Sequence, residues 1–215
     1  KDALKNLKDE GLNDNKVFYT GNTVVDAVQQ NLELADKKKD VLKEFGLEDN
    51  KYVLVTAHRA ENVDNVEKLK GIFDGLMLLQ QYLQLPIIYP IHPRTKKLVD
   101  EYKIDVHENI KLIDPVGYLE FLQLEGHAKL IVTDSGGIQE EACILQVPCV
   151  TIRENTERPE TLDSGANILA GTDPKKILHA SQKMLKTKKD WQNPFGDGRA
   201  GERILKTWME NARTD

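Results

Sequence analysis

The sequence has few residues of the kinds that mark disulfide-stabilised or membrane-spanning proteins. It contains only two cysteines, Cys143 and Cys149, which lie in apolar contexts without the spacing of metal ligands. Two such residues exclude a disulfide framework and are typical of small core residues in a reduced, cytoplasmic protein. No apolar run approaches the roughly 20 residues that a helix needs to span a bilayer. No stretch has the pattern of a signal peptide, so we expect no membrane partner.

The sequence also lacks an excess of basic residues. It has 30 Lys and Arg against 35 Asp and Glu, which gives a formal net charge of −5. A nucleic-acid-binding surface needs concentrated positive charge, so we expect no nucleic-acid partner. The 40% hydrophobic content of the 215 residues is enough for one large, packed domain or one domain with an appended segment. Because the first residues resemble the tail of a longer chain, we expect a fragment.

Short apolar runs alternate with amphipathic segments from residue 51 onward. The predicted strands are Tyr52–Ala57, Pro86–Ile91, Ile110–Ile113, Leu130–Thr133, Cys149–Ile152 and Asn167–Ala170. The predicted helices are Asp64–Gln81 with Asp64 and Glu67 as a capping pair, one that starts at Pro93, Tyr118–His127, one after Ser135, and Pro174–Lys186. Repeated β-α units predict an α/β fold: a Rossmann-like parallel sheet with helices on both faces.

The two ends of the chain carry further helix signals. We predict a helix over Asp2–Glu10, a strand over Val17–Thr20, an interrupted helical region from Thr23 to Phe45 that Gly46 stops, and a last helix from about Arg199 to Ala212. Thr23 and Asp26 resemble a capping box. We therefore expect residues 1–45 to be a linker and the end of a first domain, residues 46–198 the Rossmann-like domain, and residues 199–215 a C-terminal helix.

The most informative motif follows the predicted strand Leu130–Thr133. It reads Asp134-Ser135-Gly136-Gly137 and leads into a helix. A helix N-terminus offers unpaired N–H groups and about half a positive charge, and glycines let an anion approach the backbone. Glu141, six positions after Ser135, is placed to accept bonds from ribose hydroxyls. The motif is neither a Walker A loop nor G-x-G-x-x-G, and an ordinary N-cap with a tight turn explains it equally well.

Polar side chains also follow other predicted strands, where ligands of open parallel sheets bind. His58, Arg59 and Glu61 follow the strand that ends at Ala57. His58 can donate to a phosphate or move a proton, although a polar loop in which Arg59 and Glu61 merely pair is the alternative. His92 follows the next strand and is either a site residue or a helix cap. We assign His107 and His127 structural roles, and the pattern alone places Phe121 in the core.

A charged loop follows the strand Cys149–Ile152. It contains five ionisable side chains in the eight residues from Arg153 to Glu160, which is usual for a solvated surface loop. Beside a phosphate-binding helix, the same loop suits a substrate. Arg158 is the candidate second cation for a diphosphate, because a guanidinium binds phosphate oxygens with two parallel hydrogen bonds.

These motifs together resemble the non-hydrolysing UDP-N-acetylglucosamine 2-epimerases. The matching segments, in order, are Gly21–Asp26, His58–Asn62, His92-Pro93, Asp134–Glu141, Thr156–Glu160 and Asn193–Gly198. The resemblance covers nearly the whole chain. It implies one half of a glycosyltransferase-B-type two-domain fold, with a homodimer in the full-length form. It also implies interconversion of UDP-N-acetylglucosamine and UDP-N-acetylmannosamine, without NAD or metal, through elimination and re-addition of UDP.

The resemblance assigns roles to individual residues. It implies that Ser135, Gly136 and Gly137 hold the diphosphate, that Glu141 takes the ribose and that Phe121 lies by the uracil. His58 and Arg158 would face the phosphates, with His58 stabilising the departing UDP, and Glu157 lies in the same motif. The carboxylates that move protons in this family belong to the first domain, which the resemblance makes the missing partner.

The sequence departs from bacterial relatives at two places. They often read His-Arg-Arg-Glu-Asn-Leu-Gly where Ala60 and Val63-Asp64 stand here, and some carry glutamine where Val116 stands. In those relatives Arg59 and His92 would contact a second, regulatory sugar nucleotide, which we do not carry over. Two other functions stay open: a stand-alone nucleotide-sugar-binding module and the donor-binding half of a glycosyltransferase.

Overall fold

A six-stranded parallel sheet lies at the centre of this computed structural model, which describes residues 2–12, 17–38 and 40–211. The strands are β1 (Val53–Thr56), β2 (Ile87–Pro90), β3 (Ile110–Ile113), β4 (Leu130–Thr133), β5 (Cys149–Thr151) and β6 (Asn167–Leu169). Their order in the sheet is β3-β2-β1-β4-β5-β6. From β1 the chain adds β2 and β3 on one side of the sheet and then β4, β5 and β6 on the other, as in a Rossmann-like sheet. The direction of growth changes between β1 and β4, so the carboxyl ends of these two strands form the topological switch point. The six strands predicted from residue 51 onward are confirmed to within one residue at each end.

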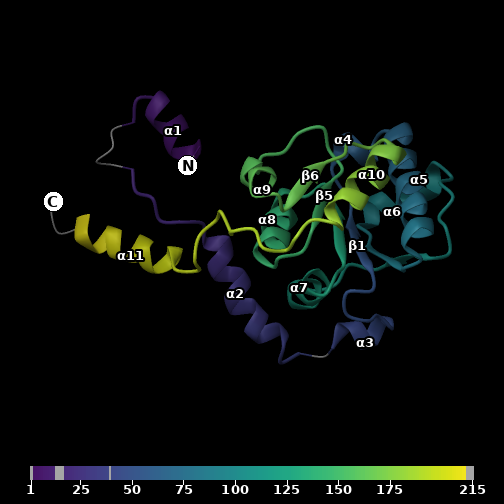
Figure 1. Cartoon of the computed structure of the whole chain (residues 1–215), viewed down its shortest axis with the longest axis horizontal. Helices are drawn as coiled ribbons and strands as arrows, with labels where there is room; N and C mark the ends of the chain where they lie inside the picture. The colour runs from purple at the N-terminus through teal and green to yellow at the C-terminus, as the bar shows by residue number, and fades with distance from the viewer. Residues whose placement is uncertain (1, 13–16, 39, 212–215) are drawn as a thin grey trace.

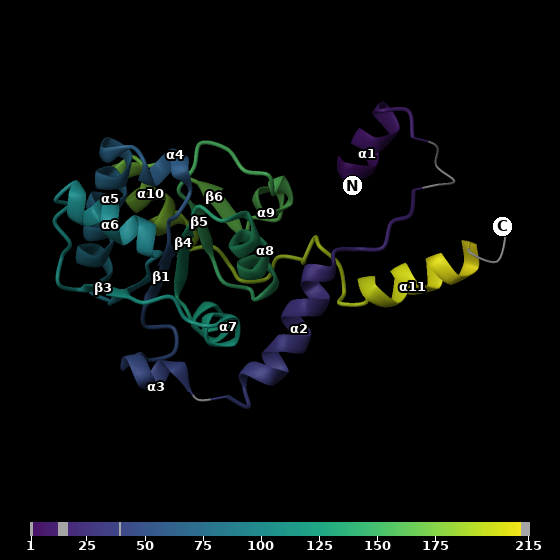
Figure 2. The same ribbon diagram turned by 180° about the vertical axis from the view of Figure 1, so that it is seen from behind.

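Helices cover both faces of the sheet, as predicted (Figures 1 and 2). They are α1 (Asp2–Asp9), α2 (Thr23–Ala35), α3 (Val41–Phe45), α4 (Ala60–Val63), α5 (Val66–Leu83), α6 (Pro93–Glu101), α7 (Tyr118–Gly126), α8 (Gly136–Ile144), α9 (Pro159–Asp163), α10 (Pro174–Met184) and α11 (Ala200–Asn211). Helices α5, α6 and α10 pack on one face, and α3, α7 and α8 pack on the other. No helix in the described part of the chain is long and apolar enough to cross a membrane.

Alternate residues of the strands face the two layers, because successive side chains of a strand point to opposite sides. Val53 and Val55 of β1 join the core beneath α5 and α10. Leu54 joins the core beneath α7 and α8, together with Cys149 of β5. Cys143 is also fully buried, so both cysteines are small core residues, as predicted.

The segment before the sheet divides into parts that pack differently. Helix α2 contacts α7 and α8, and Val41 of α3 joins the core beneath α7. The packed unit therefore reaches back to α2, well before the predicted domain start at residue 46, and that boundary stays a prediction. Helices α1 and α11 lie to one side, away from the sheet (Figure 1).

Several local predictions for the ends of the chain are wrong. Residues Val17–Thr20 form no strand. Asn22, and not Thr23, caps α2, because its side chain accepts a hydrogen bond from the Val24 amide at 3.0 Å. Asp26 instead accepts from the amides of Ala200 and Gly201 at 3.1 and 2.9 Å, so it holds the start of α11. A capping pattern in the sequence does not show at which helix N-terminus the carboxylate accepts its hydrogen bonds.

The predicted start of the long helix α5 is also wrong. Asn65 caps it by accepting from the Lys68 amide, whereas Asp64 forms an ion pair with Arg94. The predicted proline at the first turn of α6 is confirmed. The predicted stop at Gly46 is confirmed as well, because this glycine ends α3 in the left-handed conformation with φ of 64°. The predicted end of the last helix at Ala212 lies outside the described residues.

Candidate functional site

The switch point of the sheet brings the loops after β1 and β4 together. Beneath these loops the hydroxyls of Thr56 and Thr133 lie 2.6 Å apart, and the Thr133 hydroxyl accepts a hydrogen bond from the Ser135 amide at 2.9 Å. His58 and Ser135 therefore project from adjacent strand ends, although 77 positions separate them in the sequence. Ligands of open α/β sheets bind in the crevice at this place.

Asp134 is the buried residue that joins the two loops. Its fully buried carboxylate accepts from the amides of His58 at 3.0 Å and Arg59 at 2.9 Å, and from the Asn62 side chain at 3.2 Å. A buried carboxylate needs such donors to offset its lost hydration. Asp134 was not among the predicted site residues. The signal that identifies it is an acidic residue directly after a central, fully buried strand.

Asp134 also orients the imidazole of His58. The Nδ1 atom lies 3.3 Å from the Asp134 carboxylate, while the side chain keeps 46% of its surface exposed. We infer that Nδ1 carries a proton toward the carboxylate, which leaves Nε2 for a ligand. With Nδ1 protonated, Nε2 accepts a hydrogen bond in the neutral ring and donates one only when the ring is doubly protonated.

A pocket of about 270 Å³ opens beside His58. Its lining includes His92, Val116 and Phe121, together with Ile138 in the first turn of α8. Phe121 packs partly into the core, as the pattern predicted, and also faces the pocket. His92 both lines the pocket and caps α6, because its Nδ1 atom accepts from the Arg94 amide at 3.2 Å. An apolar hollow flanked by two imidazoles suits a planar base with polar edges.

The N-terminus of α8 is open to an anion. Ser135 occupies the N-cap position, as its place in the sequence predicted, but its hydroxyl makes no capping hydrogen bond and is free for a ligand among the described residues. A Cβ atom added to Gly137 would meet only the Ser135 hydroxyl, at 4.0 Å, and one added to Gly136 would meet nothing closer than 3.7 Å. The first-turn N–H groups therefore face accessible space, where helix polarity favours negative charge.

Arg158 lies beside this open helix end but is not an unpaired cation. Its Nε atom lies 2.9 Å from the Oε1 atom of Glu140 in an ion pair without hydrogen-bond geometry. The same oxygen accepts a hydrogen bond from the Asn22 side chain at 2.9 Å. Glu140 is 6% exposed, so it balances the guanidinium charge within the protein. Arg158, Glu140 and Glu157 all line a cavity of about 610 Å³ that reaches the segment before α2.

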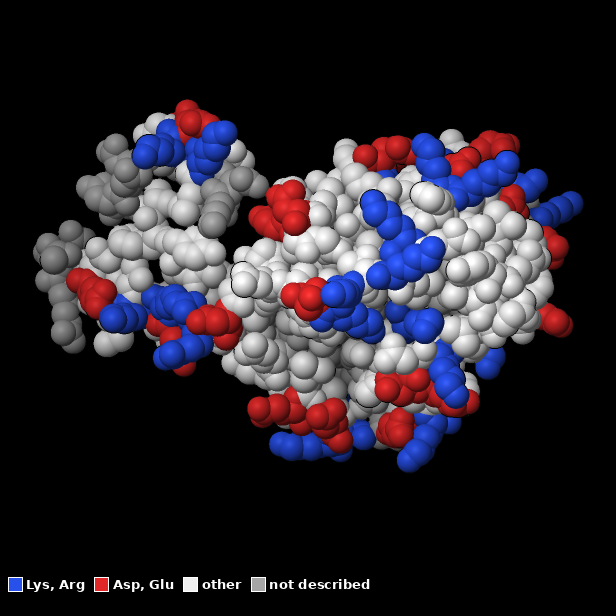
Figure 3. Space-filling view, in the orientation of Figure 1, with Lys and Arg blue, Asp and Glu red and all other residues white. Residues whose placement is uncertain are grey.

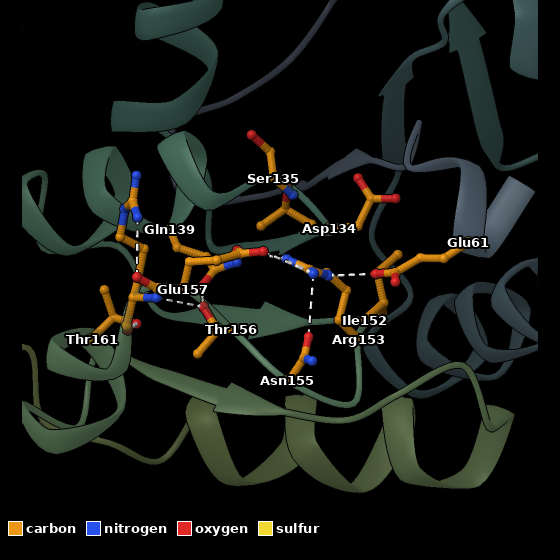
Figure 4. Close-up of polar contacts among 12 residues, drawn as sticks. Glu61, Asp134, Ser135, Gln139, Ile152, Arg153, Asn155, Thr156, Glu157 and Thr161 are labelled. Atoms are coloured by element: carbon orange, nitrogen blue, oxygen red, sulfur yellow. Dashed lines mark hydrogen bonds and ion pairs between the residues drawn. The ribbon is translucent and has the colours of Figure 1, made fainter.

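The buried guanidinium of Arg153 organises the charged loop after β5 (Figure 4). It donates to Glu61 at 2.6 Å, to both oxygens of Glu157 at 2.7 and 3.0 Å, and to Asn155 at 3.2 Å. These hydrogen bonds raise the pKa of Arg153 and lower the pKa of Glu157 to about 2. The proposed pairing of Glu61 with Arg59 is therefore wrong, because the partner of Glu61 comes from another strand. Arg153 was not predicted to have a role.

The loop is also tied to α8. The Thr156 hydroxyl donates to the Gln139 side-chain oxygen at 2.5 Å, and both residues are drawn in Figure 4. The same oxygen accepts from Asn167 of β6 at 3.3 Å. The loop that carries Glu157 and Arg158 is thus fixed against the helix that carries Ser135.

Figure 3 shows that basic and acidic side chains are mixed on this face of the molecule, so that neither positive nor negative charge covers the whole face.

Glu141 lies one and a half turns into α8, on the side that meets α7. It accepts a hydrogen bond from the Tyr118 hydroxyl at 2.9 Å, and burial raises its pKa above the ordinary value of 4.5. Its neighbour on the inner side is the carboxyl group of Glu125, which is fully buried and was not predicted to have a role. Glu141 keeps lone pairs for further donors, because a carboxylate accepts about four hydrogen bonds.

Comparison with known proteins identifies the family of the chain. The family model described as UDP-N-acetylglucosamine 2-epimerase matches residues 1–209. The chain is 52% identical over 210 residues to a UDP-N-acetylglucosamine 2-epimerase of Methanocaldococcus jannaschii, covering 95% of this chain and 57% of the relative. It is 38% identical over 224 residues to the enzyme of that name from Escherichia coli K12, covering 97% of this chain and 59% of that relative.

Solved structures superpose closely on the chain. The M. jannaschii UDP-GlcNAc 2-epimerase in complex with UDP-GlcNAc and UDP gives a TM-score of 0.89 at 51% identity, covering 97% of this chain and 59% of that one. The Neisseria meningitidis enzyme bound to UDP-GlcNAc gives 0.85 at 34% identity, with 96% and 58% covered. The predicted fold, one half of a glycosyltransferase-B-type architecture, is confirmed. The chain spans somewhat under three fifths of the relatives it matches, and it belongs to the non-hydrolysing UDP-N-acetylglucosamine 2-epimerase family.

Proposed function

We propose that this chain is the UDP-binding part of an epimerase that interconverts UDP-N-acetylglucosamine and UDP-N-acetylmannosamine. The observation that carries the proposal is the open N-terminus of α8 at the switch point, with His58 on one side and Arg158 on the other. Relatives bound to UDP-GlcNAc superpose on the chain over nearly its whole length, which supports this ligand.

The ligand would lie across α8. We place the uracil in the pocket beside Phe121 and Val116, and the ribose hydroxyls on Glu141. The diphosphate would bind the first-turn amides of α8 and the Ser135 hydroxyl, since the unpaired N–H groups and the helix dipole favour its charge. Arg158 would reach the same phosphates from its position beside Gly136, partly giving up its contact with Glu140.

The chemistry requires a leaving group to be stabilised. In the proposed reaction a base removes the C2 proton, a C1–C2 double bond forms and the C1–O bond breaks, so that UDP departs with the bonding electron pair. Proton return to the other face of C2 and re-addition of UDP complete the epimerisation. His58, held by Asp134 at Nδ1, would in its doubly protonated form donate from Nε2 to the phosphate oxygens as their charge develops. The groups that move the C2 proton would come from the remainder of the full-length protein, as would the homodimer contact.

The test uses the full-length protein with UDP-N-acetylglucosamine in heavy water, followed by proton NMR. Deuterium entering at C2, together with the appearance of the manno epimer, is the expected result. Transfer of the sugar to an added acceptor without exchange at C2 would instead favour a glycosyltransferase. Binding with neither reaction would favour a nucleotide-sugar-binding module. The cytoplasmic location expected from the cysteine content stays a prediction.

A further inference from the structure

Glu125 is a buried acid that the proposed function does not use. It lies near the end of α7 and is 0% exposed, and neither of its carboxyl oxygens has a hydrogen-bond partner among the described residues. Leu124 and Ala128, which flank it on the chain, belong to the apolar core beneath α7 and α8. Ionised and without donors, this carboxylate would cost several kcal/mol, which a folded protein rarely tolerates.

The carboxylate of Glu141, on the neighbouring helix α8, interacts with the Glu125 carboxyl group across the contact between α7 and α8. Two ionised carboxylates cannot bond to each other, because neither carries a donor hydrogen. One proton between them removes this difficulty, since a protonated carboxyl group donates a short, strong hydrogen bond to a carboxylate. Burial and the negative charge of Glu141 raise the pKa of Glu125 well above its ordinary value of 4.5. Glu125 is fully buried and has no donor, whereas Glu141 accepts from the Tyr118 hydroxyl, so we assign the shared proton to Glu125.

We propose that Glu125 stays protonated at neutral pH and donates a hydrogen bond to Glu141, so that it acts as a positioning residue for ribose recognition. The proposal rests on the proposed function, in which Glu141 accepts from the ribose hydroxyls. Glu141 then has two donors, Tyr118 from the outer side and Glu125 from the inner side. With its rotamer fixed in this way, the carboxylate loses less freedom when a ligand binds.

The proposal predicts that ribose recognition depends on pH. Deprotonating Glu125 would place two negative charges together in an apolar site and would disturb Glu141. The titratable groups that face the pair are Glu140 on α8, Tyr118 on α7, Tyr52 before β1 and Cys149 on β5. Burial raises the pKa of both tyrosines and of the cysteine, so they stay neutral through pH 9. Glu125 is then the group whose ionisation alters the site as the pH rises.

The experiment compares wild type with Glu125→Gln and Glu125→Met, using calorimetry with UDP and with inorganic diphosphate between pH 5 and 9. Glutamine keeps a donor but cannot ionise, whereas methionine fills similar volume without a donor. We expect Glu125→Met to weaken UDP binding roughly tenfold, the value of one hydrogen bond to a charged group, and to leave diphosphate binding unchanged. The ratio of wild-type to Glu125→Gln affinity for UDP should fall as the pH rises. Because both proteins bind the same ligand at each pH, any effect of UDP ionisation on affinity cancels in this ratio.

Two outcomes overturn the proposal. The first is UDP binding by Glu125→Met that equals wild type, and the second is an affinity ratio that stays flat over the pH range. If Glu125→Met fails to fold, the ratio with Glu125→Gln decides alone. A carbon-13 NMR titration of the glutamate carboxyl groups gives a direct readout, since the wild type should show one that is protonated at pH 7 and absent from Glu125→Gln.

Glu141→Ala separates this inference from the proposed function. If Glu141→Ala weakens UDP and diphosphate binding equally, Glu141 does not take the ribose, and the proposed ligand geometry is wrong. If Glu141→Ala weakens UDP binding selectively while both Glu125 variants behave as wild type, only the positioning role of Glu125 is wrong.

Discussion

At the scale of single residues, buried charges at the carboxyl edge of the sheet position the side chains that face the ligand. Asp134 joins the loops after β1 and β4 and turns His58 toward the pocket. Arg153 does the same for the loop that carries Glu157 and Arg158. Both are buried and fully engaged with the protein, so neither is offered to a ligand directly. Their effect on binding is exerted through the residues that they hold.

The proposed role of His58 predicts a specific kinetic change. In the full-length protein His58→Ala should lower kcat roughly 100- to 1000-fold and change KM little, because the contact with UDP strengthens as its charge develops. Steady-state kinetics and a thermal melt of the same variant check this. His107→Ala is the matched control, since the His107 side chain only accepts from the Asn109 amide. An unchanged kcat with a lower melting temperature would make His58 a structural residue.

The Arg153 cluster predicts a pH-dependent stability. Arg153→Met should lower the free energy of unfolding at pH 7 by about 2 kcal/mol, because charge-assisted hydrogen bonds are lost while the half-exposed carboxylates regain water. Hydrogen bonds from Arg153 lower the pKa of Glu157 from 4.5 to about 2, so this stabilisation is complete above pH 4.5. It disappears as the pH falls through about 2, where Glu157 becomes protonated in the folded state.

Urea unfolding of both proteins at several pH values measures this difference. The gap between wild type and Arg153→Met should be constant from pH 5 to 7 and should narrow below pH 4.5. Arg153→Lys is the control, because it keeps the charge but loses the paired hydrogen bonds. A gap that does not change with pH would mean that Arg153 stabilises the fold through packing alone.

At the scale of secondary-structure elements, α8 connects the parts of the site. Its first turn lies between the pocket beside His58 and the cavity beside Arg158, and its outer side carries Glu141. Its inner side packs against β4 and β5. Any change in the direction of this helix would therefore move the proposed phosphate and ribose contacts together.

The open first turn predicts that bulk at Gly137 interferes with binding but not with folding. Gly137→Val should weaken binding of inorganic diphosphate at least tenfold, since its side chain would cover N–H donors worth about 1.5 kcal/mol or more. Its melting temperature should not fall, because no atom lies within 4.0 Å of the added Cβ other than the Ser135 hydroxyl. Gly126→Val on α7 is the matched control, as open space surrounds that position too. Equal diphosphate affinity in both variants would contradict an anion site here.

At the scale of the whole molecule, the proposed nucleotide site lies at one edge of the sheet, and apolar side chains are exposed beyond it. Leu205, Trp208 and Met209 of α11 are more than half exposed, and so is Tyr19 in the segment before α2. Helices α1 and α11 stand apart from the sheet (Figure 2). The sheet domain contains the proposed UDP contacts, whereas the relatives are longer than this chain.

This arrangement predicts that the chain alone binds UDP without turning over its sugar. Calorimetry should show UDP binding, and proton NMR in heavy water should show neither C2 exchange nor the manno epimer. Addition of the full-length protein to the same sample provides the positive control. Epimerisation by the chain alone would show that its own residues, and not the rest of the protein, move the C2 proton.

The sequence predicted the elements that depend on local patterns. Apolar runs located the six strands of the sheet, and Pro93 and Gly46 marked the start of one helix and the end of another. Prediction failed where a side chain bonds to a residue far away in the sequence. Asp26 and Asp64 have the spacing of capping residues but bind α11 and Arg94 instead, because several acceptors competed for each helix start.

The same limit applies to the site. The sequence predicted that His58 and Ser135 lie together, because the topology of a parallel sheet brings strand ends to one edge, and the structure places them at the ends of the paired strands β1 and β4. Arg153, Glu140 and Glu125 were missed because their roles come from partners 92, 118 and 16 positions away. No local pattern distinguishes these charged side chains from ordinary surface residues before the fold has placed their partners.

The burial of both cysteines has a practical consequence for labelling. Cys143 and Cys149 are 0% exposed, and burial raises the pKa of both thiols. Since the thiolate is the species that reacts with alkylating reagents, the native protein should resist them at neutral pH. A single cysteine introduced on the surface would then take a fluorophore or spin label selectively, with no need to remove the natural ones. Conversely, iodoacetamide incorporation into the unaltered chain would report how often its core opens.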